Sequence, residues 1–156
     1  MRIVKADPSD LKAILELQHL SYQQEAESLN DFTIQPLLQT YDEIGQEYRK
    51  CLFLKAEDEN NEIIGSVRAY NDSGTTFVCK VFVHPRLQGQ RIGEKLLLAI
   101  ERECPAARYE LFTSNKNTRG LRLYERLGYV WFREQKVSDR LTFAFFEKQA
   151  RQTPCP

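Results

Sequence analysis

Residues 84–95 combine glycines and basic side chains in a pattern that suits the binding of a phosphate group. A β-rich apolar run up to Val83 predicts a strand, and apolar residues at every fourth position from Ile92 predict a helix. The first N–H groups of a helix lack intrahelical partners, and the helix dipole adds positive charge there. Gly89 and Gly93 would let an anion approach the main chain closely. The turn between strand and helix is therefore a candidate phosphate site.

This pattern is not specific by itself, because a strand, a glycine turn and a helix also describe many structural corners of α/β proteins. The P-loop signature G-x-x-x-x-G-K-[ST] is absent, and Gly89 and Gly93 do not form G-x-G-x-x-G. Two familiar classes of nucleotide-binding loop are thereby excluded.

Two segments resemble motifs of the GNAT acyltransferases. Residues 88–93, which follow Val-His-Pro, resemble motif A, commonly Q/R-x-x-G-x-G/A, with Arg91 where glycine is usual. Residues 117–129 resemble motif B, N-x-x-A-x-x-L-Y-x-x-x-G-F/Y, with Gly120 in place of the frequent alanine. Both motifs occur in the family's order and spacing. The resemblance covers essentially the whole chain.

The resemblance implies that the protein binds acetyl-CoA and transfers its acetyl group to an amine. The pyrophosphate would bind the amides of residues 88–94, the pantetheine would run along the end of the preceding strand, and Asn117 would hold the pantetheine arm. Tyr124 would be the general acid, because a phenol near the sulfur can donate a proton to the leaving thiolate. The implied cofactor-binding residues are Phe82, Val83, Gln88, Gly89, Gln90, Arg91, Ile92, Gly93, Glu94, Asn117 and Tyr124.

The general base is left open by the sequence. Glu110 is the first candidate, since it lies on a predicted strand beside the expected cleft. Glu43 and Glu47 on the second predicted helix, or a water chain to any of these residues, would also serve. His84 precedes a proline at the strand end, where the family carries structural histidines, so a catalytic role is not assigned to it.

The acceptor amine is also left open. The resemblance implies that the first two helices and their loop contact it, and that region is acidic, which suits a cationic amine. Arg68 and Lys80, if they face the cleft, would instead favour an acceptor bearing a carboxylate or phosphate. A basic helix face either meets the adenosine phosphate or is solvated; its members are Lys116, Arg119, Arg122 and Arg126.

The expected elements follow the order β-α-α-β-β-β-α-β-α-β-β, an α/β fold with a mixed, mostly antiparallel sheet. Strands are predicted over 2–5, 51–57, 63–70, 75–83, 108–113, 129–134 and 140–147. Helices are predicted from the Asp7 cap to residue 21 or 22, from the Thr40 capping box to Tyr48, from residue 90 or 91 to 104, and from a Thr118 cap to 127. Residues 23–39 are predicted to be a loop with at most short helical turns.

The strand over 75–83 is central to the expected site. Strict alternation places one set of its side chains together, namely Phe77, Cys79, Val81 and Val83. Because a helix intervenes, the strand over 108–113 should lie parallel to it through a right-handed crossover. The resemblance implies that this parallel pair splays apart at the cofactor.

Composition indicates one ordinary globular domain. The chain has 156 residues, 42% of them hydrophobic, and its 22 basic and 22 acidic residues cancel. Overall charge therefore does not favour binding to nucleic acid or to a membrane surface. No signal peptide or membrane span is visible, so a cytoplasmic location is expected. The domain is predicted over 1–148 and a flexible tail over 149–156.

The cysteines do not suggest a metal site. Cys51, Cys79, Cys104 and Cys155 are scattered, without a C-x-x-C pair, and only two histidines accompany them. Cys79 and Cys104 are interpreted as small core residues. No metal is predicted. A protein that binds acyl-CoA without turnover, as a sensor or structural module, remains the alternative to an enzyme, and the oligomeric state, including a homodimer, is open.

Overall fold

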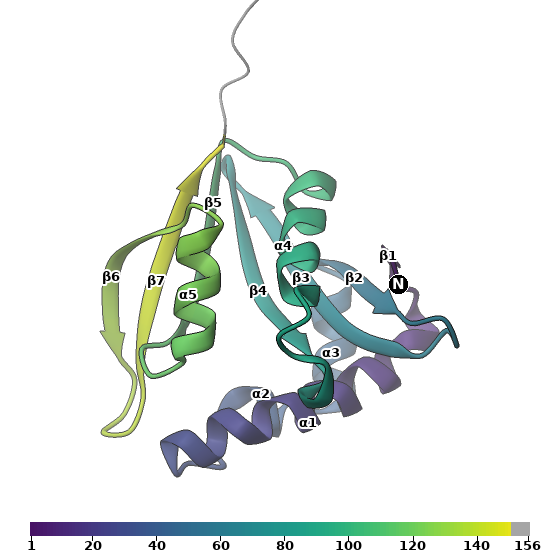
Figure 1. Cartoon of the computed structure of the whole chain (residues 1–156), viewed down its shortest axis with the longest axis horizontal. Helices are drawn as coiled ribbons and strands as arrows, with labels where there is room; N and C mark the ends of the chain where they lie inside the picture. Colours follow the sequence, from purple (N-terminus) through teal and green to yellow (C-terminus); the bar gives the residue numbers. More distant parts are fainter. Residues whose placement is uncertain (151–156) are drawn as a thin grey trace, which may run out of the picture.

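A seven-stranded sheet with the order β1-β2-β3-β4-β5-β7-β6 forms the centre of the protein (Figure 1). The structure, a computed structural model, describes residues 1–150. The strands are β1 (Arg2–Lys5), β2 (Leu52–Glu57), β3 (Ile63–Asp72), β4 (Thr75–Val83), β5 (Arg108–Ser114), β6 (Val130–Lys136) and β7 (Thr142–Gln149). All neighbouring strands are antiparallel except the parallel pair β4 and β5. The predicted mixed sheet is confirmed.

Helices cover both faces of this sheet (Figure 1). The α-helices are α1 (Leu11–Leu29), α2 (Gln35–Leu38), α3 (Tyr41–Tyr48), α4 (Ile92–Glu103) and α5 (Thr118–Arg126), and the short 3-10 helices are η1 (Pro8–Asp10) and η2 (Pro85–Leu87). Val83 packs in the main core with the buried residues of α4, whereas its neighbour Phe82 packs with those of α1 and α3. The two helical layers therefore lie on opposite faces of β4.

Helix α1 is longer than predicted. The sequence analysis ended it at Ser21 or Tyr22, but it ends at Leu29, and Asn30 follows with a left-handed φ of 50°. Its apolar stripe thins after residue 22, yet no glycine or proline interrupts it, and glutamine, glutamate and alanine are good helix formers. Its last turns are buried in a small separate core of Ala26, Leu29, Ile34 and Leu141. Two helical turns thus replace the start of a predicted loop.

Strand β4 contains a β-bulge. Lys80 lies opposite Arg68 on β3, and Val78 lies opposite the next residue, Ala69. Cys79 is therefore an extra residue with no counterpart on β3. A bulge shifts the alternation of side chains by one position, and bulges are common next to functional sites.

The predicted alternation along β4 is wrong for this reason. Cys79 was expected on the same face as Val81 and Val83. Instead Val78 is buried in the same core as Val83, and the sulfur of Cys79 lies near Glu47 of α3, on the other face. Tertiary strand pairing, which the period of a single strand does not record, decides this orientation.

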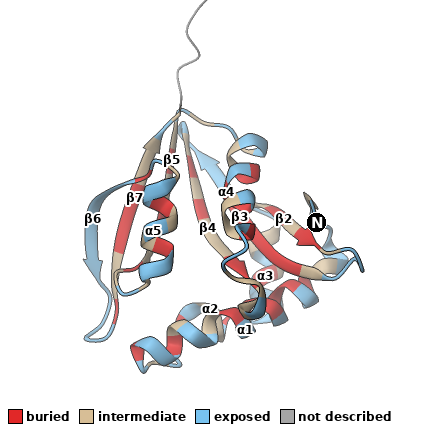
Figure 2. Ribbon diagram, viewed as in Figure 1, coloured by how far each residue is buried: buried red, intermediate tan, exposed pale blue. Residues whose placement is uncertain are grey.

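The last strands are displaced toward the C-terminus of the chain relative to the prediction. β6 and β7 end at Lys136 and Gln149, and the N–H of Ala150 donates to the carbonyl of Ala107 over 2.9 Å. The predicted tail thus begins inside the sheet, and residues 151–156 lie outside the described part of the chain. β6 is exposed along its whole length (Figure 2). No helix within residues 1–150 has the length and apolar character needed to cross a membrane.

Candidate active site

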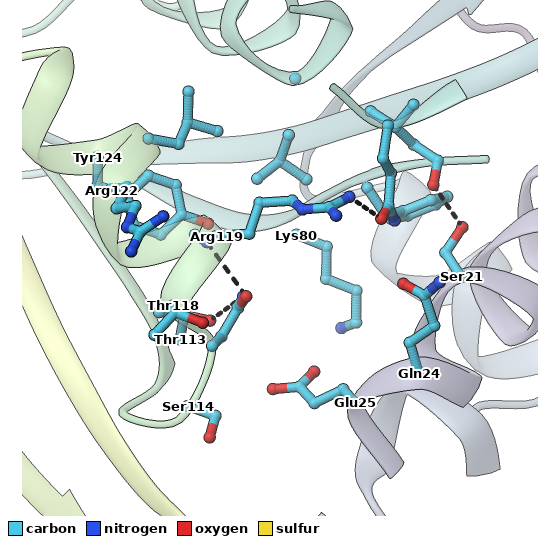
Figure 3. A pocket seen from close by; sticks show the side chains of 18 of the residues that line it. Ser21, Gln24, Glu25, Lys80, Thr113, Ser114, Thr118, Arg119, Arg122 and Tyr124 are labelled. Carbon is cyan, nitrogen blue, oxygen red and sulfur yellow. Dashed lines mark hydrogen bonds between the residues drawn. The ribbon is translucent and has the colours of Figure 1, made fainter. Parts of the chain in front are cut away.

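The parallel strands β4 and β5 separate and leave a cavity between them. Their ladder joins 75–78 to 108–111 and does not continue beyond Val78. The cavity has a volume of about 860 Å³, within the usual range for ligand sites, and is lined by α1, the ends of β4 and β5, the turn before α4, and α5. Figure 3 shows its side chains. The predicted splay is confirmed.

The turn before α4 presents backbone donors to this cavity. Gly89 and Arg91 have left-handed φ angles of 84° and 64°, and α4 begins at Ile92, one or two residues later than predicted. No side chain caps this helix start among the described residues. Its N–H groups are therefore free to bind an anion. A left-handed conformation costs a non-glycine residue about 1–2 kcal/mol, which explains why glycine is usual at the position of Arg91.

Asn117 is fixed in the cavity wall at the start of α5. Its Oδ1 accepts from the N–H of Gly120 over 3.1 Å, and its Nδ2 donates to Thr113 Oγ1 over 2.9 Å. Asn117, rather than the predicted Thr118, caps the helix. A Cβ on Gly120 would lie 2.6 Å from Asn117 Nδ2. Gly120 therefore leaves room for the Asn117 amide.

Two side-chain contacts connect helix α5 to the segment at the start of α4, on the other side of the cavity. Arg119 Nη1 donates to Gln88 Oε1, and Arg126 Nη2 lies 3.5 Å from Glu94 Oε2. Arg122 also lines the cavity. The basic face of α5 thus belongs to the cavity wall. The sequence had left open whether this face meets the adenosine phosphate or is solvated.

Tyr124 lies in the last turn of α5, in a largely apolar environment. It is 6% exposed, lines the cavity, and packs edge to face against Tyr129 and Phe146, with ring centroids 6.2 and 5.7 Å away. Burial raises the pKa of Tyr124, and the nearby carboxylate of Glu25 adds to the rise. The phenol therefore holds its proton at neutral pH.

Glu25 reaches the cavity because α1 continues past residue 22. Figure 3 shows Glu25 of α1, Lys80 of β4 and Ser114 of β5 around the same part of the cavity. Burial raises the pKa of the Glu25 carboxyl, and the Ser114 backbone partly offsets the rise. Burial, followed by the charge of Arg68, lowers the pKa of Lys80. Two ionisable groups with perturbed pKa values at one cavity make it a candidate functional site.

Residues 11–129 match the sequence model of the Acetyltransferase (GNAT) family. The chain belongs to this family. It is therefore an N-acetyltransferase. Comparison with curated protein sequences gives no significant match.

Solved GNAT structures share the fold over nearly the whole chain. The PaiA N-acetyltransferase of Thermoplasma acidophilum, solved with coenzyme A, is 17% identical, with a TM-score of 0.74 over 96% of this chain and 98% of that one. The ribosomal-protein-S18-alanine N-acetyltransferase of Escherichia coli is 14% identical, with a TM-score of 0.79 over 97% and 95%. YncA of Salmonella typhimurium, a putative acetyltransferase solved with acetyl-CoA, is 22% identical, with a TM-score of 0.74 over 100% and 97%.

Most residues that the GNAT motifs assigned to the cofactor lie in the cavity wall. They are Phe82, Val83, Gln88, Gly89, Arg91, Ile92, Gly93, Glu94, Asn117 and Tyr124. Gln90, assigned with them, is not among the lining residues. His84 has a structural role, since its Nδ1 accepts from the N–H of Arg86 over 3.1 Å.

The structure does not bring the predicted general bases of this GNAT protein to the cavity. Glu110 lies 2.9 Å from Arg108 Nη2 in an ion pair and is absent from the cavity wall. Glu43 and Glu47 line a second, smaller hollow, which Lys80 also lines. The sequence analysis did not consider Glu25 as a candidate base, although it lines the cavity. The signal that could have found it is the helical spacing of Ser21, Glu25 and Ser28, which all line the cavity.

Arg68 has a structural role and does not line either hollow. It is 1% exposed, and its Nη2 lies 3.0 Å from Gln18 Oε1, 2.8 Å from Gln39 Oε1 and 2.9 Å from Glu47 Oε1. These contacts join α1, the α2–α3 connection and α3 to β3. Of the two central cations considered for acceptor recognition, Lys80 alone lies in the cavity wall.

Proposed function

We propose that this GNAT protein transfers the acetyl group of acetyl-CoA to a primary amine by direct attack in a ternary complex. The observation that carries the proposal is the composition of one cavity wall. Free backbone donors at the start of α4 lie at one end, and Tyr124 and Glu25, both with raised pKa values, lie in the same cavity. The first group suits a diphosphate, and the second pair suits proton transfer.

The cavity fits acetyl-CoA in two further respects. Beyond Val78, β4 has no strand partner on its β5 side, so its edge can accept the amide-containing pantetheine arm as an added strand. The arginines of α5 supply positive charge beside the turn. Two solved GNAT structures of the same fold hold coenzyme A or acetyl-CoA, which supports the same cosubstrate here.

Tyr124 is the general acid in this proposal. The phenol is protonated at neutral pH and so has a proton to give to the leaving thiolate, and Tyr124 lies in the wall of the cavity between the splayed strands. Glu25 replaces Glu110 as the general base. Its raised pKa brings the carboxyl closer to the operating pH, where a base removes a proton from an amine most effectively.

The test is release of free thiol from acetyl-CoA across a panel of small amines and peptide N-termini. Tyr124→Phe should lower kcat about 10²-fold or more, since general acid catalysis contributes about 10²–10⁴-fold. Tyr129→Phe is the matched control, because its hydroxyl donates to Glu101 Oε2 and Tyr129 does not line the cavity. An unchanged rate in Tyr124→Phe with an active acceptor would remove the acid assignment.

A binding measurement separates the enzyme from a non-catalytic acyl-CoA protein. Acetyl-CoA at a hundred times its dissociation constant should stabilise the native state by about 2.7 kcal/mol. Stabilisation without thiol release from any amine in the panel would favour the sensor. An unshifted melting curve would exclude the cosubstrate.

A further inference from the structure

The fold brings together three potential metal ligands that are far apart in the sequence. One ligand atom each from Glu47, Cys51 and Cys79 lies within 4.8 Å of the other two. Glu47 and Cys51 are held four residues apart at the end of α3, where the N–H of Cys51 donates to the carbonyl of Glu47 over 3.0 Å. Cys79 is the bulge residue of β4. The sequence predicted no metal site, because no two cysteines are close along the chain.

We propose that Glu47, Cys51 and Cys79 form a binding site for Zn²⁺. Two thiolates and one carboxylate are ligands that Zn²⁺ accepts, and three protein ligands leave a fourth position open. Sulfur atoms bound to Zn²⁺ at about 2.3 Å lie roughly 3.8 Å apart in a tetrahedral site. Ligand atoms within 4.8 Å of one another therefore reach this arrangement by side-chain movements of about 1 Å.

A metal ion suits this pair of cysteines better than a disulfide does. Cys51 precedes β2 and Cys79 lies in β4, and β3 lies between these strands. Backbones two strands apart are separated by roughly 9–10 Å. The Cα atoms of a disulfide lie about 4.4–6.8 Å apart, so a direct bond would require backbone movement. A cation that bridges the two sulfur atoms requires no such movement.

The surroundings support the carboxylate ligand. Arg68 Nη2 and Gln39 Nε2 lie 2.9 and 2.8 Å from the same oxygen, Glu47 Oε1, so both orient the carboxylate and leave Oε2 for the cation. Arg68 and Lys80 also carry positive charge. Metal binding releases the protons of both thiols, and the two thiolates and the carboxylate then carry one more charge than these two cations.

The site adjoins the proposed reaction. Cys79 lines the main cavity, and Glu47 lines the second hollow beside Lys80. A bound cation would therefore lie between the two hollows, on the α3 side of β4. On the basis of the proposed function, we expect Zn²⁺ to slow acetyl transfer. The binding itself is independent of that function.

Cobalt titration tests the site directly. Reduced protein in a Cys155→Ser background should bind one Co²⁺ per chain, give thiolate-to-cobalt absorption in the near ultraviolet, and lose this absorption when Zn²⁺ is added. Cys51→Ser and Cys79→Ser should each weaken binding at least tenfold, and Glu47→Gln should weaken it less. Cys104→Ser is the matched control, because Cys104 is also a half-buried free cysteine but lies outside the cluster.

A second measurement on the protein with all its cysteines guards against misfolded variants. Zn²⁺ should protect Cys51 and Cys79, and not Cys104, from alkylation located by mass spectrometry. Absence of the absorption, its persistence in Cys51→Ser, or equal protection of all three thiols would overturn the proposal. Inhibition by Zn²⁺ should disappear in Cys51→Ser, because the variant lacks one metal ligand. The substitution leaves the cavity wall unchanged, since Cys51 does not line the cavity. The cobalt absorption and the protection from alkylation test the metal site even if no acceptor amine is found.

Discussion

The cofactor side and the acceptor side of the cavity are built in different ways. The cofactor side comes from two short segments, the turn leading into α4 and the start of α5, and its main groups are backbone amides and the Asn117 cap. The proposed acceptor side takes single side chains from α1 and β4, including Glu25, Lys80 and Cys79. Its groups are held by contacts between distant residues.

This difference determines which half of the site can be predicted from the sequence. A backbone-amide site needs glycines, a strand end and a helix start at fixed spacing, and these leave a local pattern. A side-chain site needs only that residues meet after folding, so no spacing records it. The following variants test whether the two sides are as separate as this comparison implies.

Glu25→Gln should have the largest effect. We expect kcat/KM to fall about 10²–10⁴-fold, because the amide cannot accept the amine's proton, while acetyl-CoA affinity changes little. In the parent protein, the rate should fall as pH drops through the Glu25 pKa, which burial raises above its ordinary value. Glu27→Gln, on an exposed position of the same helix, should remain fully active. Equal losses in both variants would contradict the assignment.

The stability of Glu25→Gln gives an independent check. Because the folded pKa is raised, the fold favours the protonated carboxyl. The resulting stability is present at low pH and is lost as pH rises through the folded pKa. At neutral pH, glutamine removes the cost of a buried charge, so the variant should melt at the same or a higher temperature. A clearly lower melting temperature at neutral pH would show that the carboxylate holds the fold together.

Arg68→Met should have an intermediate effect, on stability rather than on cofactor binding. The buried Gln18 and Gln39 side chains would lose a donor, and a buried unpaired polar group costs roughly 1–3 kcal/mol. We expect the free energy of unfolding, measured with urea, to fall by about 2–3 kcal/mol. Arg2→Met, which breaks an ion pair whose arginine is 65% exposed, should cost less than about 1 kcal/mol. Similar values for the two variants would contradict a buried network.

Gly120→Ala should have the smallest effect, confined to the cofactor side. The new Cβ displaces the Asn117 amide, and loss of a neutral hydrogen bond costs about 0.5–1.5 kcal/mol, so acetyl-CoA binding should weaken about 2–10-fold. Gly45→Ala in α3 meets no atom within 4 Å and should instead stabilise the protein by about 0.5–1 kcal/mol. Calorimetry and thermal melts measure the two outcomes. Unchanged acetyl-CoA affinity in Gly120→Ala would show that the Asn117 amide does not hold the cosubstrate.

Particular residues show where sequence reasoning succeeded and where it did not. Gly89 and Asn117 stand at positions whose geometry is set by neighbours in the chain, so their placement in the cavity wall could be predicted. Cys79 was assigned to the wrong face, because one extra residue in β4 reverses the alternation and depends on pairing with β3. Glu25 was placed in a loop, because α1 is completed by burial against Ile34 and Leu141.

The sequence by itself determined the family, through its resemblance to the GNAT motifs, as well as the mixed sheet with its parallel pair and the glycine turn that lines the cavity. These features follow from local periodicity, caps and motif spacing. Only the tertiary structure decided that Glu25 enters the cavity, that Glu110 pairs with Arg108 outside the cavity wall, and that two cysteines far apart in the sequence lie near Glu47. The physical reason is that strand register, a bulge and helix docking are fixed by packing between distant segments, and packing determines which side chains converge.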